Sequence, residues 1–255
     1  MEAIALLIII GLVWGSFLNV VIYRLPAGLN LSKPRSFCPQ CKRQIPFYDN
    51  IPLLSFIILR GKCRKCGARI PMSYLLVEVL TPASFVLVFL EVGGGLPLIA
   101  GCIFSSALIA LGFIDYTHKV LPDAITYPGI VLAMIYSFFR ADLKPLQALL
   151  GAVVGGGFLL AAYGLYYLIR KKEGLGLGDV TLMLMVGAFL GWGLTLLTLM
   201  LGSIMGALVG IFIILRRKKT LQFALPFGTF LAPAAFIAFL WGERIISWYL
   251  ALYRR

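Results

Sequence analysis

A glycine-rich run followed by an aspartate is the first stretch of this chain that could carry chemistry. Residues 174–179 read Gly-Leu-Gly-Leu-Gly-Asp, and a strongly apolar segment from Val180 to Leu190 follows directly. A carboxylate at the edge of a membrane span is costly unless it has a function. Glycines let an extended peptide approach the backbone closely, because they carry no side chain. We therefore interpret Asp179 as one half of an aspartyl-protease pair, with Gly176 and Gly178 supporting the site.

A second carboxylate is needed for this chemistry, and the chain has only ten acidic residues. Three of them are expected near the same membrane boundary as Asp179: Glu78, Asp115 and Asp123. Asp115 follows the apolar segment 98–114, which spans roughly 26 Å as a helix at about 1.5 Å per residue. That length nearly crosses the hydrocarbon layer. Asp115 is therefore predicted to lie at the boundary where Asp179 begins its own segment.

The helix dipole favours Asp115 over Asp123 as the partner. Asp123 follows Leu121-Pro122 and is expected in the first turn of a helix, where an acidic side chain is stabilised without any catalytic role. Asp115 is expected at a helix C-terminus, where the dipole disfavours an anion. We therefore predict that Asp115 pairs with Asp179 and keep Asp123 as the alternative, in a supporting position.

Two carboxyl groups at one depth can share a proton. Their proximity favours a state in which one is ionised and the other is neutral. The ionised group takes a proton from water, which attacks the peptide carbonyl, and the neutral group donates to the developing oxyanion or to the leaving amine. A Gly-x-Gly-Asp string alone is also compatible with an ordinary turn between spans. The single histidine, His118, is given no role.

Four of the five cysteines form two pairs, with the spacing C-x2-C-x21-C-x2-C. This spacing is typical of a zinc ribbon. Thiols in the cytoplasm stay reduced, so the four are expected to hold one structural zinc ion and to carry no metal chemistry. The predicted ligands are Cys38, Cys41, Cys63 and Cys66. The surrounding segment has little core, so a metal would supply much of its folding free energy. Cys102 is expected to be a packing residue within a span.

The composition excludes a soluble globular protein. Hydrophobic residues make up 61% of the 255 residues and charged residues 13%, and the mean hydropathy is +0.97. Soluble domains carry about 25% charged residues. The formal net charge is +13, but the basic residues cluster beside apolar segments and do not indicate nucleic-acid binding. Contact with anionic membrane lipid is the expected consequence of these clusters.

We predict an all-α polytopic membrane protein with about eight transmembrane helices and one polar segment. Residues 1–23 form the first helix, with Gly11, Gly15 and Asn19 as packing positions. Residues 24–72 form the cysteine-bearing segment, whose six prolines argue against a long helix. Residues 73–255 form a seven-helix peptidase region, with helices at about 73–92, 98–114, 122–139, 146–169, 180–190, 194–215 and 226–250.

The basic residues also predict an orientation. Threading the eight helices from an external N-terminus places eighteen basic residues in the inner loops and four in the outer loops and at the C-terminus. Ten of the eighteen lie in the segment 24–72. This asymmetry follows the positive-inside rule. Both termini are therefore expected outside, and the cysteine segment and the two aspartates are expected to face the cytoplasm.

In combination these motifs are specific, and the chain resembles the bacterial type IV prepilin peptidases, the bifunctional leader peptidase/N-methyltransferases. The resemblance covers nearly the whole chain. It rests on the two cysteine pairs and on the stretches 15–26 (GSFLNVVIYRLP), 49–55 (DNIPLLS), 114–115 (ID), 121–123 (LPD), 176–179 (GLGD) and 226–228 (PFG).

The resemblance implies a GxGD-type intramembrane aspartyl protease of the bacterial inner membrane, with Asp115 and Asp179 as the catalytic pair. It implies cleavage after a glycine in the leader of pilins and pseudopilins. It also implies methylation of the new N-terminal amine from S-adenosylmethionine. The cysteine-bearing segment is tied to methyl transfer in the family, and Gly61, Lys62 and Glu78 match positions associated with it.

Two alternatives stay open on the sequence. One is a peptidase without methyltransferase activity, because no glycine-rich methyltransferase fold is visible in residues 24–72. The other is a zinc-stabilised membrane transporter or scaffold whose acidic residues relay protons. Transport sites usually lie near the bilayer midplane, whereas Asp115 and Asp179 are expected at one boundary, so the transporter is disfavoured. The resemblance is incomplete at Thr181, where many members carry a lysine.

Overall fold

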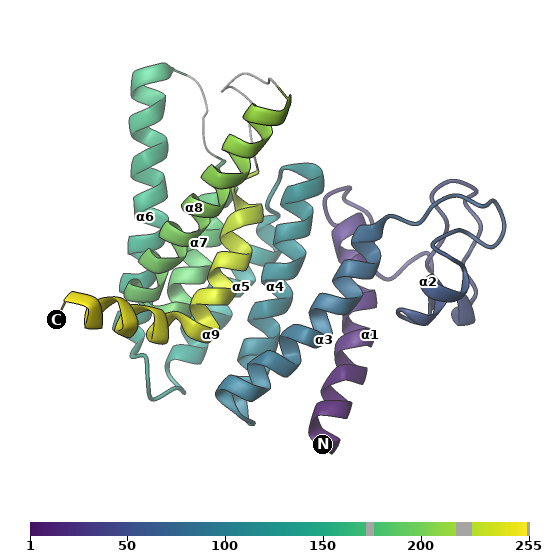
Figure 1. Cartoon of the computed structure of the whole chain (residues 1–255), viewed down its shortest axis with the longest axis horizontal. Coiled ribbons are helices and arrows are strands. Elements are labelled where there is room, and N and C mark those ends of the chain that lie inside the picture. The colour runs from purple at the N-terminus through teal and green to yellow at the C-terminus, as the bar shows by residue number, and fades with distance from the viewer. Residues whose placement is uncertain (172–175, 218–225, 254–255) are drawn as a thin grey trace. The chain divides into compact units, whose positions relative to one another are not determined.

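A computed structural model describes residues 1–171, 176–217 and 226–253, and these residues are predominantly helical (Figure 1). The long helices are α1 (Glu2–Arg24), α3 (Met72–Val92), α4 (Leu96–His118), α5 (Asp123–Ser137), α6 (Pro145–Arg170), α7 (Leu177–Leu190), α8 (Trp192–Arg217) and α9 (Gly228–Tyr253). Between α1 and α3 the chain forms a short 3-10 helix, η1 (Phe47–Asn50), and a short helix α2 (Leu54–Ile58). Within the described ranges, β pairing is limited to two isolated bridges.

The predicted all-α polytopic architecture is confirmed. Each predicted apolar segment coincides with one long helix, and six of these helices are long and apolar enough to cross a membrane: α1, α3, α4, α6, α8 and α9. The helix α7 is apolar but has 14 residues, and α5 has 15. Both are shorter than the roughly 20 residues that a full span requires. The expected count of about eight therefore corresponds to six candidate spans and two shorter helices in the described part of the chain.

The chain divides into two compact units, Met1–Phe113 and Ile114–Arg255, which we call unit 1 and unit 2. The boundary falls inside α4. Unit 1 therefore contains α1, the cysteine-bearing segment, α3 and most of α4. Unit 2 begins with the end of α4, including Asp115, and continues through α9.

In unit 1, α1 and α3 pack closely through small residues of α1. A β-carbon on Gly11 would lie 2.5 Å from the α3 backbone, and one on Gly15 would lie 3.2 Å from Cα of Glu78. The Asn19 side chain donates a hydrogen bond to the Tyr74 carbonyl at 3.0 Å. These contacts are the packing role expected for the small and polar residues of the first helix. They also determine where Glu78 lies relative to α1.

In unit 2, α7 is the central helix. It packs against α5, α6, α8 and α9, and ten of its fourteen residues are buried. A helix that is apolar on every side belongs in an interior, which explains why the segment 180–190 shows no polar face. The position of α7 places Asp179, in its first turn, inside unit 2.

The contact between α6 and α7 depends on two glycines that face each other. A β-carbon on Gly151 would lie 2.2 Å from the Gly187 carbonyl oxygen, and one on Gly187 would lie 2.1 Å from the Gly151 carbonyl oxygen. Neither position has room for a side chain, because the two backbones are in contact. By contrast, a β-carbon on Gly157, also in α6, would meet no atom within 4 Å.

We expect Gly187→Ala to destabilise the protein by roughly 1–3 kcal/mol or more, because α6 and α7 must separate to admit the methyl group. Gly157→Ala is the matched control. It is expected to be neutral or stabilising by up to about 1 kcal/mol, because alanine favours a helix over glycine. Thermal unfolding of the purified proteins in one detergent measures both effects. Equal melting temperatures for the two variants would contradict the close contact.

Candidate functional site

Asp115 and Asp179 lie in unit 2 on different helices. Asp115 belongs to the last turn of α4, and Asp179 belongs to the first turn of α7. Asp115 is 5% exposed and Asp179 is 7% exposed. Both carboxylates are therefore held inside the protein, at helix ends, as the sequence predicts.

The first turn of α9 holds the Asp115 carboxylate. The Thr229 backbone N–H donates to Asp115 Oδ2 at 2.7 Å, and the Thr229 hydroxyl donates to the same oxygen at 3.1 Å. Free N–H groups and the positive end of the dipole make a helix N-terminus suited to an anion. The C-terminus of α4 disfavours a negative charge at Asp115, and the N-terminus of α9 compensates for it.

The backbone at Gly228 joins the two aspartates. A β-carbon on Gly228 would lie only 3.0 Å from Asp115 Oδ2. The Gly228 backbone also interacts with the Asp179 carboxylate, which in turn experiences the charge of Asp115. The structure therefore brings the two predicted aspartates together around one turn of backbone.

The glycines before Asp179 shape the entry to α7. Gly176 is the N-cap residue of α7, and its carbonyl accepts a hydrogen bond from the Asp179 N–H at 3.1 Å. Gly178 faces Leu121, and a β-carbon on Gly178 would lie 2.8 Å from Leu121 Cβ. Side chains larger than hydrogen are therefore excluded at Gly178 unless Leu121 moves. Residues 174 and 175 of the glycine run lie outside the described residues.

Asp123 has a different environment from the two buried aspartates. It lies in the first turn of α5 and is exposed, as expected for an acidic residue placed there by the helix dipole. Gly228 and Thr229 were not among the predicted site residues. Gly228 belongs to the PFG stretch at 226–228, which contributed to the family resemblance but had no predicted structural role. Thr229 contacts Asp115 across 114 positions of the chain, and no local pattern predicts that contact.

In unit 1, the four paired cysteines lie together. Their sulfur atoms are all within 4.8 Å of one another, and the Cys38 and Cys66 sulfurs are 3.8 Å apart. Four sulfurs bound at about 2.3 Å around a tetrahedral zinc ion are about 3.8 Å apart, so the cluster fits such an ion. The backbone N–H groups of Cys66 and Lys65 donate to the Cys63 sulfur, and such donors favour the thiolate. Thiolates are the form that binds metal.

The two cysteine turns share one backbone structure. The Lys42 N–H donates to the Cys38 carbonyl at 2.8 Å, and the Gly67 N–H donates to the Cys63 carbonyl at 2.9 Å. Lys42 and Gly67 both have left-handed backbones, with φ of 57° and 70°. The isolated bridges 37–44 and 62–69 enclose the two turns in the same way. The segment is therefore built from two equivalent turns that present their sulfurs to one point.

Gly61 and Lys62 lie directly before the second cysteine turn. Gly61 has a left-handed backbone with φ of 65°, and a β-carbon there would lie 3.0 Å from the Phe56 ring. Lys62 forms the isolated bridge with Arg69. Phe56 lines a cavity of unit 1, so Gly61 supports one wall of that cavity.

Glu78 projects from α3 into the same cavity. Its Oε2 accepts a hydrogen bond from the Leu53 N–H at 2.8 Å, and the Ser16 and Asn19 side chains also interact with the carboxylate. Leu53 has φ of 60°, an unfavourable conformation for a residue with a β-carbon. The Glu78 carboxylate therefore stabilises the strained backbone at Leu53, and several hydrogen-bond donors fix its own position.

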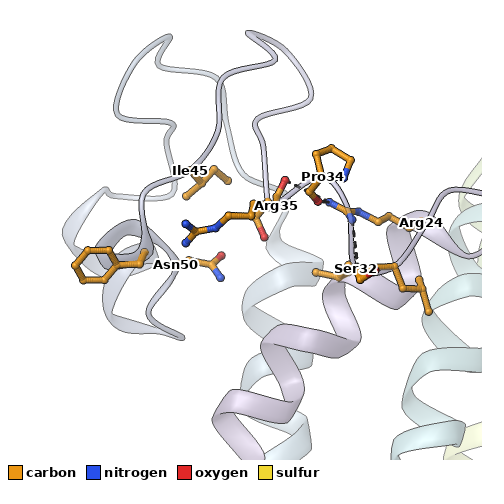
Figure 2. A pocket seen from close by; sticks show the side chains of 10 residues that line it. Arg24, Ser32, Pro34, Arg35, Ile45 and Asn50 are labelled. Atoms are coloured by element: carbon orange, nitrogen blue, oxygen red, sulfur yellow. Dashed lines mark hydrogen bonds between the residues drawn. The ribbon is translucent and has the colours of Figure 1, made fainter.

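Two adjoining cavities occupy unit 1. The larger has a volume of about 290 Å³, lies against the cysteine turns, α1 and α3, and contains Glu78. The smaller has a volume of about 240 Å³ and is lined by Arg24 and Arg35 (Figure 2). Both cavities are lined by Val20, Arg24, Ser36, Ile45 and Asn50.

Arg24 organises the wall between the two cavities. It is 4% exposed, and its guanidinium donates to backbone carbonyls rather than to a carboxylate, as the dashed lines in Figure 2 show in part. The accepting carbonyls belong to Asn30, Leu31, Pro34 and Arg35. Arg24 is therefore a structural residue whose donors are already engaged.

The chain combines membrane-length apolar helices with a cluster of four cysteines that could hold a metal ion. The chain belongs to the type IV leader peptidase family. The model of that family matches residues 102–211, and the model of the bacterial peptidase A24 N-terminal domain matches residues 9–92.

The curated relatives agree with this assignment over nearly the whole chain. Prepilin leader peptidase/N-methyltransferase of Pseudomonas putida is 38% identical over 96% of this chain and 92% of its own length. The protein of the same name from Aeromonas hydrophila is 38% identical, covering 96% of this chain and 93% of the relative. That of Klebsiella pneumoniae is 41% identical, covering 76% and 87%. No solved structure shows a significant match.

The cysteine cluster predicts a metal content. We expect the purified wild-type protein to contain about one zinc ion per chain, and Cys63→Ser to contain almost none, because a tetrahedral site needs all four sulfurs. Cys102→Ser is the matched control and is expected to keep its metal, since Cys102 lies in α4 away from the cluster. Elemental analysis measures the metal. Equal zinc in the two variants would contradict the predicted site.

Proposed function

We propose that this protein removes the leader peptide of type IV prepilins or pseudopilins and then methylates the new N-terminal residue. The observation that supports leader cleavage is the pair of buried aspartates that both contact Gly228. The names of the full-length relatives support both activities.

In this proposal, Asp115 and Asp179 share the proton that peptide hydrolysis needs. Two donors from Thr229 stabilise the ionised form of Asp115, so Asp115 is the base that takes a proton from water. Asp179 is the neutral partner that donates to the leaving amine. Burial of both groups keeps their mutual interaction strong, because the surroundings have a low dielectric constant.

The site would work at the cytoplasmic boundary of a bacterial inner membrane. The positive-inside distribution of charge supports this orientation, with both termini outside and the inner loops in contact with anionic lipid. A prepilin carries a basic leader in the cytoplasm and an apolar helix in the membrane. Its scissile bond would then lie at the depth predicted for Asp115 and Asp179. Cleavage follows a glycine of the leader.

We assign methyl transfer to unit 1, with S-adenosylmethionine as the methyl donor. The four cysteines would hold a structural zinc ion, which stabilises the fold of the segment and takes no part in the reaction. Glu78 would bind the new N-terminal amine and accept the proton that this amine loses before methylation. A cationic ligand such as this amine is expected beside Glu78, because no basic residue of the described chain lies within ion-pair distance of its carboxylate.

The second candidate is a peptidase without methyltransferase activity. Mass spectrometry of a prepilin incubated with the protein and S-adenosylmethionine separates the two, because cleavage and methylation change the mass by different amounts. Cleaved but unmethylated product would favour the second candidate. Unchanged prepilin would contradict both.

We expect Asp115→Asn and Asp179→Asn each to lower the cleavage rate at least about 100-fold, because each removes one proton-transfer group. Asp123→Asn tests the alternative partner and is expected to keep the rate within about tenfold of wild type, since a surface carboxylate in a first helical turn acts mainly through the dipole. A gel assay of prepilin processing measures the rates. Near-normal processing by either of the first two variants would overturn the assignment.

Thr229 provides a finer test of the aspartate pair. Thr229→Val removes the hydroxyl donor to Asp115 and is expected to slow cleavage by roughly 10-fold to 100-fold, the range for a hydrogen bond to a charged group. Thr229→Ser retains the donor and is the matched control, with a rate near that of wild type. If the valine and serine variants cleave at the same rate, the hydroxyl does not support the reaction.

A further inference from the structure

We propose that the two adjoining cavities of unit 1 together form the binding site for S-adenosylmethionine, with Arg35 binding its carboxylate and Glu78 facing its cationic side. This inference rests on the proposed methyl transfer and assigns it a place and residues. All of the residues concerned belong to unit 1.

The smaller cavity contains one guanidinium with free donors. The guanidinium of Arg24 is saturated by carbonyls, whereas no carboxylate of the described chain lies within ion-pair distance of Arg35. Figure 2 shows the Arg35 side chain pointing into the cavity between Ile45 and Asn50. A planar guanidinium binds a carboxylate through two parallel hydrogen bonds. The cavity is therefore suited to the carboxylate end of an amino acid.

One of the two carboxylates that line the larger cavity, that of Glu78, forms no ion pair with a described residue. Asp49 also lines it, but Asp49 accepts hydrogen bonds from Nε and Nη2 of Arg64, the shortest at 2.6 Å. Glu78 has only neutral donors, including the Leu53 N–H. Arg43, Lys65 and Arg69 also line this cavity, but no basic residue of the described chain lies within ion-pair distance of Glu78. A fixed carboxylate without an ion-pair partner is suited to a cationic ligand. A sulfonium and an incoming amine are both cations of this kind.

Apart from its charged and polar side chains, the surface of the larger cavity is mainly apolar. Its lining includes Ile51, Phe56, Leu59, Ile70 and Tyr74, which suit the flat adenine ring and the methyl group. Small-molecule sites usually have volumes of roughly 300–1,000 Å³. Each cavity alone lies below that range, at about 290 and 240 Å³, so a ligand of this length would occupy both. S-adenosylmethionine combines an amino-acid end that carries a carboxylate, a cationic sulfonium and a flat aromatic ring, which matches this arrangement of groups.

The reaction balances with these residues. The substrate ammonium first loses a proton to Glu78. The nitrogen lone pair then forms a bond to the methyl carbon, while the carbon–sulfur bond breaks and its electron pair stays on sulfur. The positive charge moves from sulfur to nitrogen, so the products are a methylated ammonium, beside the protonated Glu78, and a neutral thioether.

Equilibrium binding to the full-length protein in detergent tests the proposal directly. Three probes are needed: S-adenosylmethionine, its decarboxylated analogue, and S-adenosylhomocysteine, which lacks the positive sulfur. We expect Arg35→Ala to bind S-adenosylmethionine about tenfold to a hundredfold more weakly. The decarboxylated analogue should bind wild type and Arg35→Ala equally, because the carboxylate that Arg35 would contact is missing. Lys33→Ala is the matched control in the same loop and should bind like wild type, since Lys33 lines neither cavity.

Glu78→Gln tests the proposed contact with the sulfonium, because it removes the negative charge and leaves the size of the side chain almost unchanged. Wild type should prefer S-adenosylmethionine over S-adenosylhomocysteine by a larger factor than Glu78→Gln does. Zinc content confirms that each variant retains the structure of the segment.

Equal affinity of Arg35→Ala and Lys33→Ala for S-adenosylmethionine would overturn the site, even if the protein methylates its product. If the wild-type protein neither binds the donor nor methylates, the proposed methyl transfer itself fails.

Discussion

The compensation of a buried charge by a helix end is the interaction on which the site in unit 2 depends. A carboxylate in an apolar protein interior needs donors from the protein, because no bulk water reaches it. Asp115 lies where the dipole of α4 opposes its charge, and the first turn of α9 reverses that effect with two hydrogen bonds to one oxygen. The same turn contacts Asp179 through Gly228. The pair therefore exists only when α4, α7 and α9 are correctly packed.

Much of this arrangement could be predicted from the sequence, and the missing part has a clear physical reason. The helix dipole indicated that Asp115 lacks support from its own helix end, and its hydrogen-bond donors in the structure come from Thr229 in α9. Its compensating donor could not be predicted, because Thr229 is far away in the chain and a threonine in a first helical turn is commonplace. The apolarity of 180–190 predicted a membrane helix, but not its central position in unit 2. It could not predict that Gly151 and Gly187 meet, since that contact depends on how two helices cross.

In unit 1, the polar segment 24–72 has little hydrophobic core and is ordered by other interactions. Two equivalent cysteine turns bring four sulfurs to one point, and the Arg24 guanidinium gathers four carbonyls of the preceding loop. The cysteine spacing predicted the first of these. The second was not predicted, because Arg24 appears in the sequence as one basic residue among many at the end of a span. Leu53 and its strained amide likewise depend on Glu78, which comes 25 positions later.

The length of α7 links the depth of Asp179 to the membrane itself. A helix of 14 residues is about 21 Å long at 1.5 Å per residue, whereas the hydrocarbon layer is about 30 Å thick. With one end of α7 at the outer surface, its first turn would lie several ångströms below the inner surface unless the bilayer thins around it. Hydrophobic mismatch would then affect the surroundings of the two carboxylates. Lipid chain length would set how far a substrate bond must travel, and how readily water follows it, to reach the two carboxylates.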